Sequence, residues 1–123
     1  METYQIVFII LIFLIIVLRV KKYFDTRSIN EYSASEVKKM LKASNNILLL
    51  DVRTLKEYKS GAIKPSIHIP LHEIPVKFDQ LKKYQSKEII CYCQSGSRSI
   101  SAAIKLKKLG FNSSNMKGGY STW

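Results

Sequence analysis

Residues 89–99 read IICYCQSGSRS, an apolar run that reaches a cysteine and then opens into small polar residues. Beyond them, apolar residues recur at spacings of three and four, the period of a helix that buries one face: Ile100, Ala103, Ile104, Leu106 and Leu109. Gly110 closes this pattern, as a glycine commonly does after the C-terminus of a helix. The segment therefore predicts a strand, a short loop that begins at Cys93, and a helix that ends before Gly110.

The predicted loop has the features of a site that holds an anion or a thiolate. Its successive backbone N–H groups can point into one concavity, and the positive end of the following helix dipole lies beside them. Gly96 lets the backbone turn tightly, and Arg98 adds a fixed positive charge. The residues predicted to surround the anion are Gln94, Ser95, Gly96, Ser97, Arg98 and Ser99.

Cys93 is the predicted nucleophile of this loop. The reactive form of cysteine is the thiolate, and an unperturbed thiol with a pKa near 8.5 is only about 3% ionised at pH 7. N–H groups and hydroxyls that lowered the pKa by about one to two units would raise that fraction to roughly a quarter to three quarters. Cys91 is interpreted as a small apolar residue of the strand, although its spacing from Cys93 would also suit a resolving thiol.

Strands and helices alternate along the rest of the chain. A helix is predicted after Ser33, which forms a capping box with Glu36, and its inward residues are Val37, Met40 and Leu41. The predicted strands occupy residues 47–52, 66–69 and 88–92. Further helices are predicted over residues 54–60 and 75–84, the second with Val76, Phe78 and Leu81 inward. This alternation predicts an α/β domain with a parallel central sheet flanked by helices.

The composition allows one modest domain and gives no reason to expect a nucleic-acid partner. The chain has 123 residues and a formal net charge of +11, and about 100 residues remain outside the N-terminal apolar segment. Most lysines fall on the polar faces of predicted helices, where a solvated surface needs no partner. The two cysteines, separated by one residue, suit neither a disulfide framework nor a zinc site, so both are expected to be reduced thiols.

An apolar segment near the N-terminus predicts a single membrane-spanning helix. Residues 6–18 are thirteen consecutive apolar side chains, and the seventeen residues from Tyr4 to Val20 reach the lower limit for a bilayer core of about 30 Å. The basic start and small-residue cleavage site of a signal peptide are both missing. Basic residues follow the apolar run and none precedes it, so the positive-inside rule places the rest of the chain in the cytoplasm. These residues are Arg19, Lys21, Lys22 and Arg27.

The segment from about Ser28 to Trp123 resembles the single-domain rhodaneses, a family of sulfurtransferases. Four segments in the family's order carry the resemblance: LDVR at 50–53 with Glu57 and Tyr58, GAI at 61–63 leading to IPL at 69–71, CQSGSRS at 93–99, and Gly118-Gly119 with Trp123. The chain departs from the family where Gly-His-Ile and Gly-Ala-x-Asn-Ile-Pro are usual, with GAI and PSIHIP in their place. We therefore divide the chain into an anchor with a basic flank, residues 1–22, a linker, residues 23–30, and a rhodanese-like domain, residues 31–123.

The resemblance implies that Cys93 takes a sulfane sulfur from a small anionic donor such as thiosulfate, or from a persulfide, and carries it as a cysteine persulfide. The sulfur would then pass to cyanide or a thiol, with a sulfur-carrying protein as one such acceptor. Arg98 and the loop N–H groups would hold the donor and the persulfide. No metal or organic cofactor is implied. The residues expected to have structural roles are Asp51, Arg53, Glu57 and Trp123.

Two other functions are compatible with parts of the pattern. Cysteine phosphatases and arsenate reductases of a related fold have five residues between cysteine and arginine, whereas four separate Cys93 from Arg98. The shorter loop leaves too little room for a phosphate bonded to sulfur. The main alternative is a catalytically silent rhodanese-like module that docks partner proteins at the membrane, although such modules often lack the cysteine. Metal binding by His68 and His72 is not expected, because Pro70 prevents a shared helical face.

Overall fold

The computed structural model describes all residues from Met1 to Trp123. The helices are α1 (Thr3–Arg27), α2 (Ala34–Ala43), α3 (Leu55–Ser60), α4 (Ile74–Lys77) and α5 (Ser97–Lys108), with 3₁₀ turns η1 (Leu71–Glu73), η2 (Phe78–Tyr84) and η3 (Gly119–Thr122). The strands are β1 (Asn30–Tyr32), β2 (Ile47–Asp51), β3 (Ile67–His68), β4 (Glu88–Tyr92) and β5 (Ser113–Met116).

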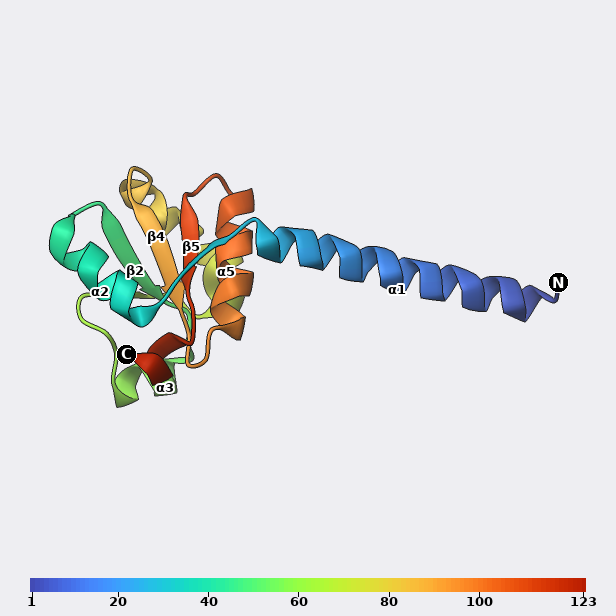
Figure 1. Ribbon diagram of the computed structural model, residues 1–123, viewed down its shortest axis with the longest axis horizontal. Coiled ribbons are helices and arrows are strands. Elements are labelled where there is room, and N and C mark those ends of the chain that lie inside the picture. Colours follow the sequence, from blue (N-terminus) through green and yellow to red (C-terminus); the bar gives the residue numbers. More distant parts are fainter.

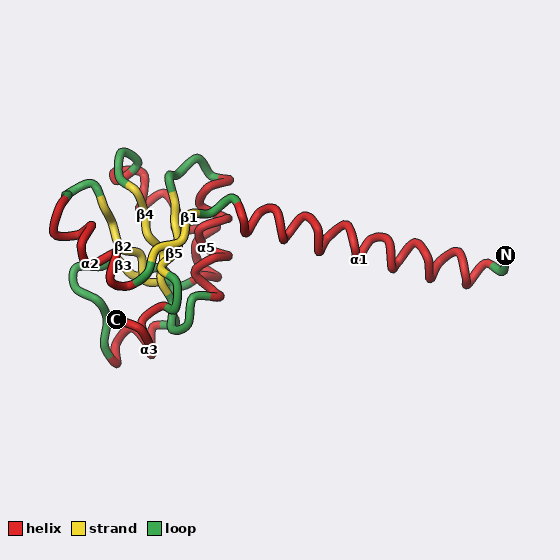
Figure 2. Tube along the Cα trace, viewed as in Figure 1, coloured by secondary structure: helices red, strands yellow, loops and turns green.

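The five strands form one sheet in the order β1-β5-β4-β2-β3, and every neighbouring pair is parallel. This confirms the predicted α/β fold with a parallel sheet. Strand β4 lies at the centre, where Leu50 of β2 and Asn115 of β5 flank Cys91. Because the strands are parallel, their C-terminal ends lie at one edge of the sheet. The loop that joins β4 to α5 begins at that edge (Figure 2).

Alternating side chains of β4 contribute to two separate hydrophobic cores, one on each face of the sheet. Ile89, Cys91 and Cys93 belong to the core that α4, η2 and α5 cover. Ile90 and Tyr92 belong to the core that α2 covers. Figure 1 shows α5 and α2 on opposite sides of the strands. The near-continuous apolar sequence of β4 is therefore explained by burial on both faces.

The helices begin where the sequence provides caps. Ser33 and Glu36 form the predicted capping box of α2, and Thr54 and Glu57 form a second box that begins α3. At the end of α5, Gly110 takes a positive φ of 93°, which a residue with a side chain adopts only with strain. The predicted helix that follows Cys93 is thus present, and it stops where expected.

The predicted helix over residues 75–84 is wrong in form. The α-helical part ends at Lys77, and residues Phe78–Tyr84 continue as the 3₁₀ turn η2. With three residues per turn, Phe78, Leu81 and Tyr84 fall on one face and pack against the core below α5. Val76 was predicted to face inward but is 77% exposed, because Ile74 is the buried residue of α4 and a residue two positions further along a helix points to the opposite side.

Helix α1 extends further than the sequence analysis predicted. It continues through Arg27, and only Ser28 and Ile29 separate it from β1. The predicted linker over residues 23–30 is therefore mostly helical, since no glycine or proline interrupts the chain there. None of the residues of α1 is buried, and its most apolar window has a mean hydropathy of 2.6, so the helix is long and apolar enough to cross a membrane.

The C-terminal end of α5 holds the C-terminal end of α1. Lys107 Nζ donates a hydrogen bond of 2.9 Å to the Ser28 carbonyl oxygen, and Lys108 Nζ lies 3.3 Å from Asp25 Oδ2. Beyond these contacts α1 projects away from the domain as a straight rod (Figure 1). The orientation of α1 relative to the domain is thus set by α5 and by a connection of two residues.

Candidate active site

Cys93 lies directly after β4, at the point where the chain leaves the sheet. The next residues turn sharply, and Gly96 adopts a φ of 104° before α5 begins at Ser97. A side chain at Gly96 would be strained there, and its Cβ would lie 3.1 Å from the Gly118 nitrogen. Cys93 itself is fully buried beneath the loop. The strand, loop and helix predicted from residues 89–99 are therefore present in that order.

The sulfur of Cys93 is surrounded by hydrogen-bond donors. The Gly96 N–H donates to Sγ at 3.0 Å, and the Ser99 hydroxyl lies 3.4 Å from it. Burial acts to raise the pKa of the Cys93 thiol, but hydrogen bonds from the Ser99 side chain and from the N–H groups of Ser99, Gly96 and Ser95 outweigh it. The pKa of Cys93 is lowered as a result, which favours the thiolate.

Ser99 is held in place by a residue that the sequence analysis did not identify. Its hydroxyl lies 2.6 Å from Asn115 Oδ1, so its single proton is shared between that oxygen and Cys93 Sγ, and Asn115 Nδ2 donates to the Gly96 carbonyl oxygen at 3.4 Å. Both Ser99 and Asn115 are buried. Asn115 belongs to β5, whose polar sequence SSNM gave no strand signal, so nothing in the sequence pattern pointed to it.

Arg98 is paired with Glu57 rather than left free beside the loop. Its two terminal nitrogens lie 2.7 and 2.8 Å from the two carboxylate oxygens. The hydrogen bonds from Arg98 lower the pKa of Glu57 to about 2, assisted by the Thr54 backbone and side chain and opposed by partial burial. The pKa of Arg98 is raised, chiefly by Glu57 and to a lesser extent by the nearby Cys93. Glu57 therefore holds the Arg98 side chain of the cysteine loop through both carboxylate oxygens.

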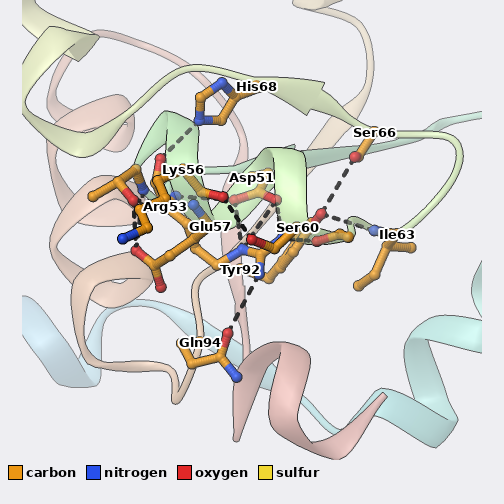
Figure 3. Close-up of polar contacts among 12 residues, drawn as sticks. Asp51, Arg53, Lys56, Glu57, Ser60, Ile63, Ser66, His68, Tyr92 and Gln94 are labelled. Carbon is orange, nitrogen blue, oxygen red and sulfur yellow. Dashed lines mark hydrogen bonds and ion pairs between the residues drawn. The ribbon is translucent and has the colours of Figure 1, made fainter.

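A buried ion pair supports the loop from the side of β2. Arg53 Nη2 lies 2.8 Å from Asp51 Oδ2 and donates to the Gly61 carbonyl oxygen at 2.7 Å. Arg53 also lies 3.3 Å from the Gln94 side-chain oxygen, and Figure 3 shows it between Asp51 and Gln94. The Tyr120 ring covers the guanidinium at 4.4 Å. Asp51 and Arg53 therefore connect β2, α3 and the cysteine loop.

The C-terminal turn packs directly on the loop. The Tyr120 N–H donates to the Cys93 carbonyl oxygen at 2.8 Å, and the Ser121 N–H donates to the Gln94 carbonyl oxygen at 3.1 Å. At Gly119 an added Cβ would fall far inside contact distance of the Cys93 carbonyl oxygen. Trp123 is half-buried against the core on the α2 side. The C-terminal turn thus holds the backbone of Cys93 and Gln94 in place through their carbonyl oxygens.

The remaining predicted residues lie near Cys93 without a side-chain contact to its sulfur. Gln94, Ser95 and Ser97 are exposed, and the hydroxyls of the two serines make no hydrogen bond within the protein. Cys91 is fully buried, and burial raises the pKa of its thiol, with the neighbouring Cys93 adding to the effect. This environment suits the apolar strand residue that the sequence analysis favoured for Cys91.

The two histidines do not converge with other ligands. His68 Nε2 lies 2.7 Å from the Arg53 carbonyl oxygen, and its ring stacks on Tyr58 with a centroid distance of 4.4 Å. His72 is exposed on η1. No group of three or more His, Cys, Asp or Glu side chains is placed to hold a metal ion.

The parallel five-stranded sheet with a cysteine loop at its edge is the architecture of a rhodanese-like domain, and the model of that family matches residues 33–123. The chain belongs to this family. It is 30% identical over 96 residues to a sulfurtransferase of Allochromatium vinosum, covering 77% of this chain and 88% of that protein. It is 35% identical over 95 residues to the putative sulfurtransferase YtwF of Bacillus subtilis, covering 77% and 90%.

A solved structure agrees with this assignment. The crystal structure of a rhodanese-like domain protein from Staphylococcus aureus is similar with a TM-score of 0.72 at 26% sequence identity, and the match covers 77% of this chain and 91% of that one. The family and its named relatives support a sulfurtransferase-like enzyme with a sulfur-related function.

Proposed function

We propose that this protein transfers a sulfane sulfur from a donor to a thiophilic acceptor through a persulfide on Cys93. The observation that carries the proposal is the position of Cys93 Sγ, which lies 3.0 Å from the Gly96 N–H and 3.4 Å from the Ser99 hydroxyl. These donors stabilise a thiolate at a buried position, where an unassisted thiol would stay protonated and unreactive.

The first step is attack of the Cys93 thiolate on the outer sulfur of the donor. With thiosulfate, a bond forms between Sγ and the sulfane sulfur while the sulfur–sulfur bond of thiosulfate breaks, and sulfite leaves with the bonding electron pair. Sγ is buried in the resting structure, so the loop after Cys93 has to open before the donor can reach it. The product is a persulfide whose outer sulfur carries the negative charge.

The second step returns the enzyme to its starting state. A cyanide ion or a thiolate attacks the outer sulfur of the persulfide, and the Cys93 thiolate leaves with the electron pair of the broken bond. The products are thiocyanate from cyanide, or a new persulfide from a thiol. The same N–H groups that stabilise the resting thiolate stabilise it as a leaving group, so one loop serves both steps.

Arg98 and the loop N–H groups hold the anionic donor and the charged persulfide in this proposal. Two of the five N–H groups of Arg98 are bound to Glu57, so the Nε–H and one N–H on each terminal nitrogen remain for the donor. Glu57 keeps the guanidinium at a fixed place beside the loop. Asp51 and Arg53 support the loop, and Trp123 fills the core on the opposite face of the sheet.

We propose further that α1 anchors the domain in a membrane and that the domain faces the cytoplasm. The support is the length and apolar character of α1, the absence of any buried residue in it, and the basic residues at its C-terminal end. Protease protection tests the orientation. In inverted inner-membrane vesicles the domain is expected to be digested, whereas in intact spheroplasts it is expected to be protected; the opposite pattern would reverse the orientation.

The test of sulfur transfer uses the full-length protein in detergent micelles. After exposure to thiosulfate, mass spectrometry is expected to find one added sulfur atom on Cys93, and added cyanide is expected to release it as thiocyanate. Cys91→Ser should still acquire the sulfur, whereas Cys93→Ser should not. If neither an adduct nor thiocyanate forms, the protein is better explained as a catalytically silent docking module at the membrane.

A further inference from the structure

The C-terminal part of α1 carries a shallow hollow on one side of the helix, which we call the α1 hollow. Its walls are the side chains of Arg19, Lys22, Tyr23, Thr26 and Arg27. These residues recur at spacings of three and four along α1, so they form one continuous stripe on the helix surface. The stripe combines three basic side chains with two hydroxyls, which is the chemistry of an anion site.

Within the α1 hollow, Tyr23 positions the guanidinium of Arg27. Arg27 Nη1 donates a hydrogen bond of 2.6 Å to the Tyr23 hydroxyl, and the guanidinium carbon lies over the Tyr23 ring, 5.4 Å from its centre. Only one of the five N–H groups of Arg27 is used in this contact. The others remain free to bind a phosphate, which a planar guanidinium can do through two oxygens at once.

The positive charges of the α1 hollow have no carboxylate partner. Arg19, Lys22 and Arg27 form none of the ion pairs of the structure. Asp25 is the one acidic residue in this part of α1, and Lys108 of α5 pairs with it at 3.3 Å. Because the C-terminus of a helix carries a partial negative charge, an anion here is attracted by the basic side chains alone. All three of these charges are available for that anion.

The position of the α1 hollow along the helix matches the headgroup layer of a bilayer. The apolar span from Tyr4 to Val20 has its midpoint at residue 12. With a rise of about 1.5 Å per residue, half of a hydrocarbon core of about 30 Å corresponds to about ten residues, so the core ends near Lys22. The headgroup layer extends roughly 5 to 7 Å further, which reaches Arg27. The hollow from Lys22 onward therefore lies among the headgroups, and the long side chain of Arg19 can extend into the same layer.

Building on the proposed anchoring of α1 in a membrane, we propose that the α1 hollow binds the headgroup phosphate of an anionic phospholipid. Arg27 and Lys22 hold the phosphate, and Arg19 reaches it from the hydrocarbon side. A zwitterionic headgroup carries its own positive charge beside the phosphate, and the three basic side chains repel that charge. The hollow therefore selects lipids whose headgroup has a net negative charge, and the bound lipid fixes the depth of α1 in the bilayer.

The test compares phosphatidylglycerol with phosphatidylcholine of the same acyl chains. Each lipid is titrated into the full-length protein in detergent micelles, and native mass spectrometry measures the fraction of protein that carries a bound lipid. Lys22→Gln is compared with Lys21→Gln, which makes the same change of charge one residue away, at an exposed lysine of α1 that does not line the hollow. An alkaline wash of vesicles that contain the protein tests separately whether α1 is integrated in the bilayer.

In the parent protein we expect phosphatidylglycerol to bind more tightly than phosphatidylcholine. Lys22→Gln should weaken the binding of phosphatidylglycerol about fivefold, the contribution of one basic side chain near an anionic surface, and Lys21→Gln should weaken it less than about twofold. Equal losses in the two variants would indicate a diffuse attraction without a site. That result, or a parent without lipid preference, overturns the inference and leaves the anchoring of α1 intact. If the alkaline wash removes the protein from the vesicles, the anchoring and this inference fail together.

Discussion

The two ends of α5 hold different parts of the molecule by different kinds of contact. At the N-terminal end, buried groups determine the geometry: the Gly96 N–H and the Ser99 hydroxyl lie beside the sulfur of Cys93, and Asn115 holds Ser99. At the C-terminal end, the exposed side chains of Lys107 and Lys108 hold the end of α1. Breaking a buried hydrogen bond is costly because the separated groups find no water to bind. Breaking an exposed ion pair costs little, because water solvates both charged groups.

This difference indicates that α5 keeps its reactive end rigid and leaves its α1 end adjustable. A change at the N-terminal end should alter both stability and chemistry. A change at the C-terminal end should alter how α1 meets the domain and leave Cys93 unaffected. Substitutions matched between the two ends can test this contrast directly.

The largest expected effect comes from Gly119→Ala, in the turn that packs on the cysteine loop, compared with Gly110→Ala just after the C-terminal end of α5. Both glycines have positive φ, so alanine costs about 1–2 kcal/mol at each. At Gly119 the new methyl group also collides with the Cys93 carbonyl oxygen, which adds roughly 1–3 kcal/mol, whereas at Gly110 the nearest atom is 4.0 Å away.

Urea unfolding and thiosulfate loading of both variants measure this prediction. Gly119→Ala is expected to unfold at lower urea concentration than Gly110→Ala and to acquire sulfur on Cys93 more slowly. Gly110→Ala should load at the parental rate. Equal stabilities and equal loading rates in the two variants would mean that the turn at Gly119 does not position the loop.

The next effect is a pH dependence that Glu57 creates at the N-terminal end. Its folded pKa of about 2 lies below the ordinary value of 4.5, so its contribution to stability is complete above pH 4.5 and is lost as the pH falls toward 2. Because Glu57 and Arg98 are about one-third exposed, we expect about 1–2 kcal/mol. Urea unfolding between pH 6 and pH 3 should show this loss in the parent and a shallower slope in Glu57→Gln; parallel slopes would contradict it.

A smaller effect is expected from Ser99→Ala, which removes the hydroxyl donor to Cys93 Sγ. The pKa of Cys93 should rise by roughly half a unit to one unit, because a hydrogen bond that favours the thiolate is lost. The midpoint of iodoacetamide alkylation against pH should therefore move to higher pH. Ser101→Ala, at a half-buried position of α5 without a side-chain hydrogen bond, serves as the control. An unmoved midpoint in Ser99→Ala would show that the backbone donors suffice.

The smallest effect is expected at the C-terminal end of α5. A double-mutant cycle of Lys108→Ala and Asp25→Ala should give a coupling free energy below about 0.5 kcal/mol, because both side chains are open to water. Sulfur loading of Cys93 should equal that of the parent in all three variants. A coupling above about 1 kcal/mol, or slower loading, would remove the contrast between the two ends.

The sequence predicted those parts of the fold that carry a local signal: an apolar run, a helical period or a capping box. Strand β4, the loop and α5 follow this rule, as do the capped starts of α2 and α3. Strand β5 does not, because its buried polar side chains depend on partners elsewhere in the chain. Ser114 is bonded to Glu88 and Asn115 to Ser99. No local pattern indicates such pairs.

The position of the candidate site could be predicted from the sequence, but its side-chain contacts could not. Cys93 and its loop could be located from a strand that ends in small residues. The pairing of Arg98 with Glu57 could not, because the two residues are 41 apart in sequence and meet only when α3 packs beside the loop. The continuation of α1 through residues 23–27 could have been predicted, since no helix-breaking residue occurs there.

The short connection after α1 has a consequence for the acceptor. Helix α1 is about 37 Å long, and two residues after it the chain enters β1 of the sheet. If α1 spans a bilayer, the two-residue connection keeps the cysteine loop within a narrow range of heights above the lipid, while the exposed contacts of α5 let the domain change its tilt. An acceptor protein that diffuses in the same bilayer and presents its thiol at that height would meet the loop at a raised effective concentration. A freely soluble acceptor would not.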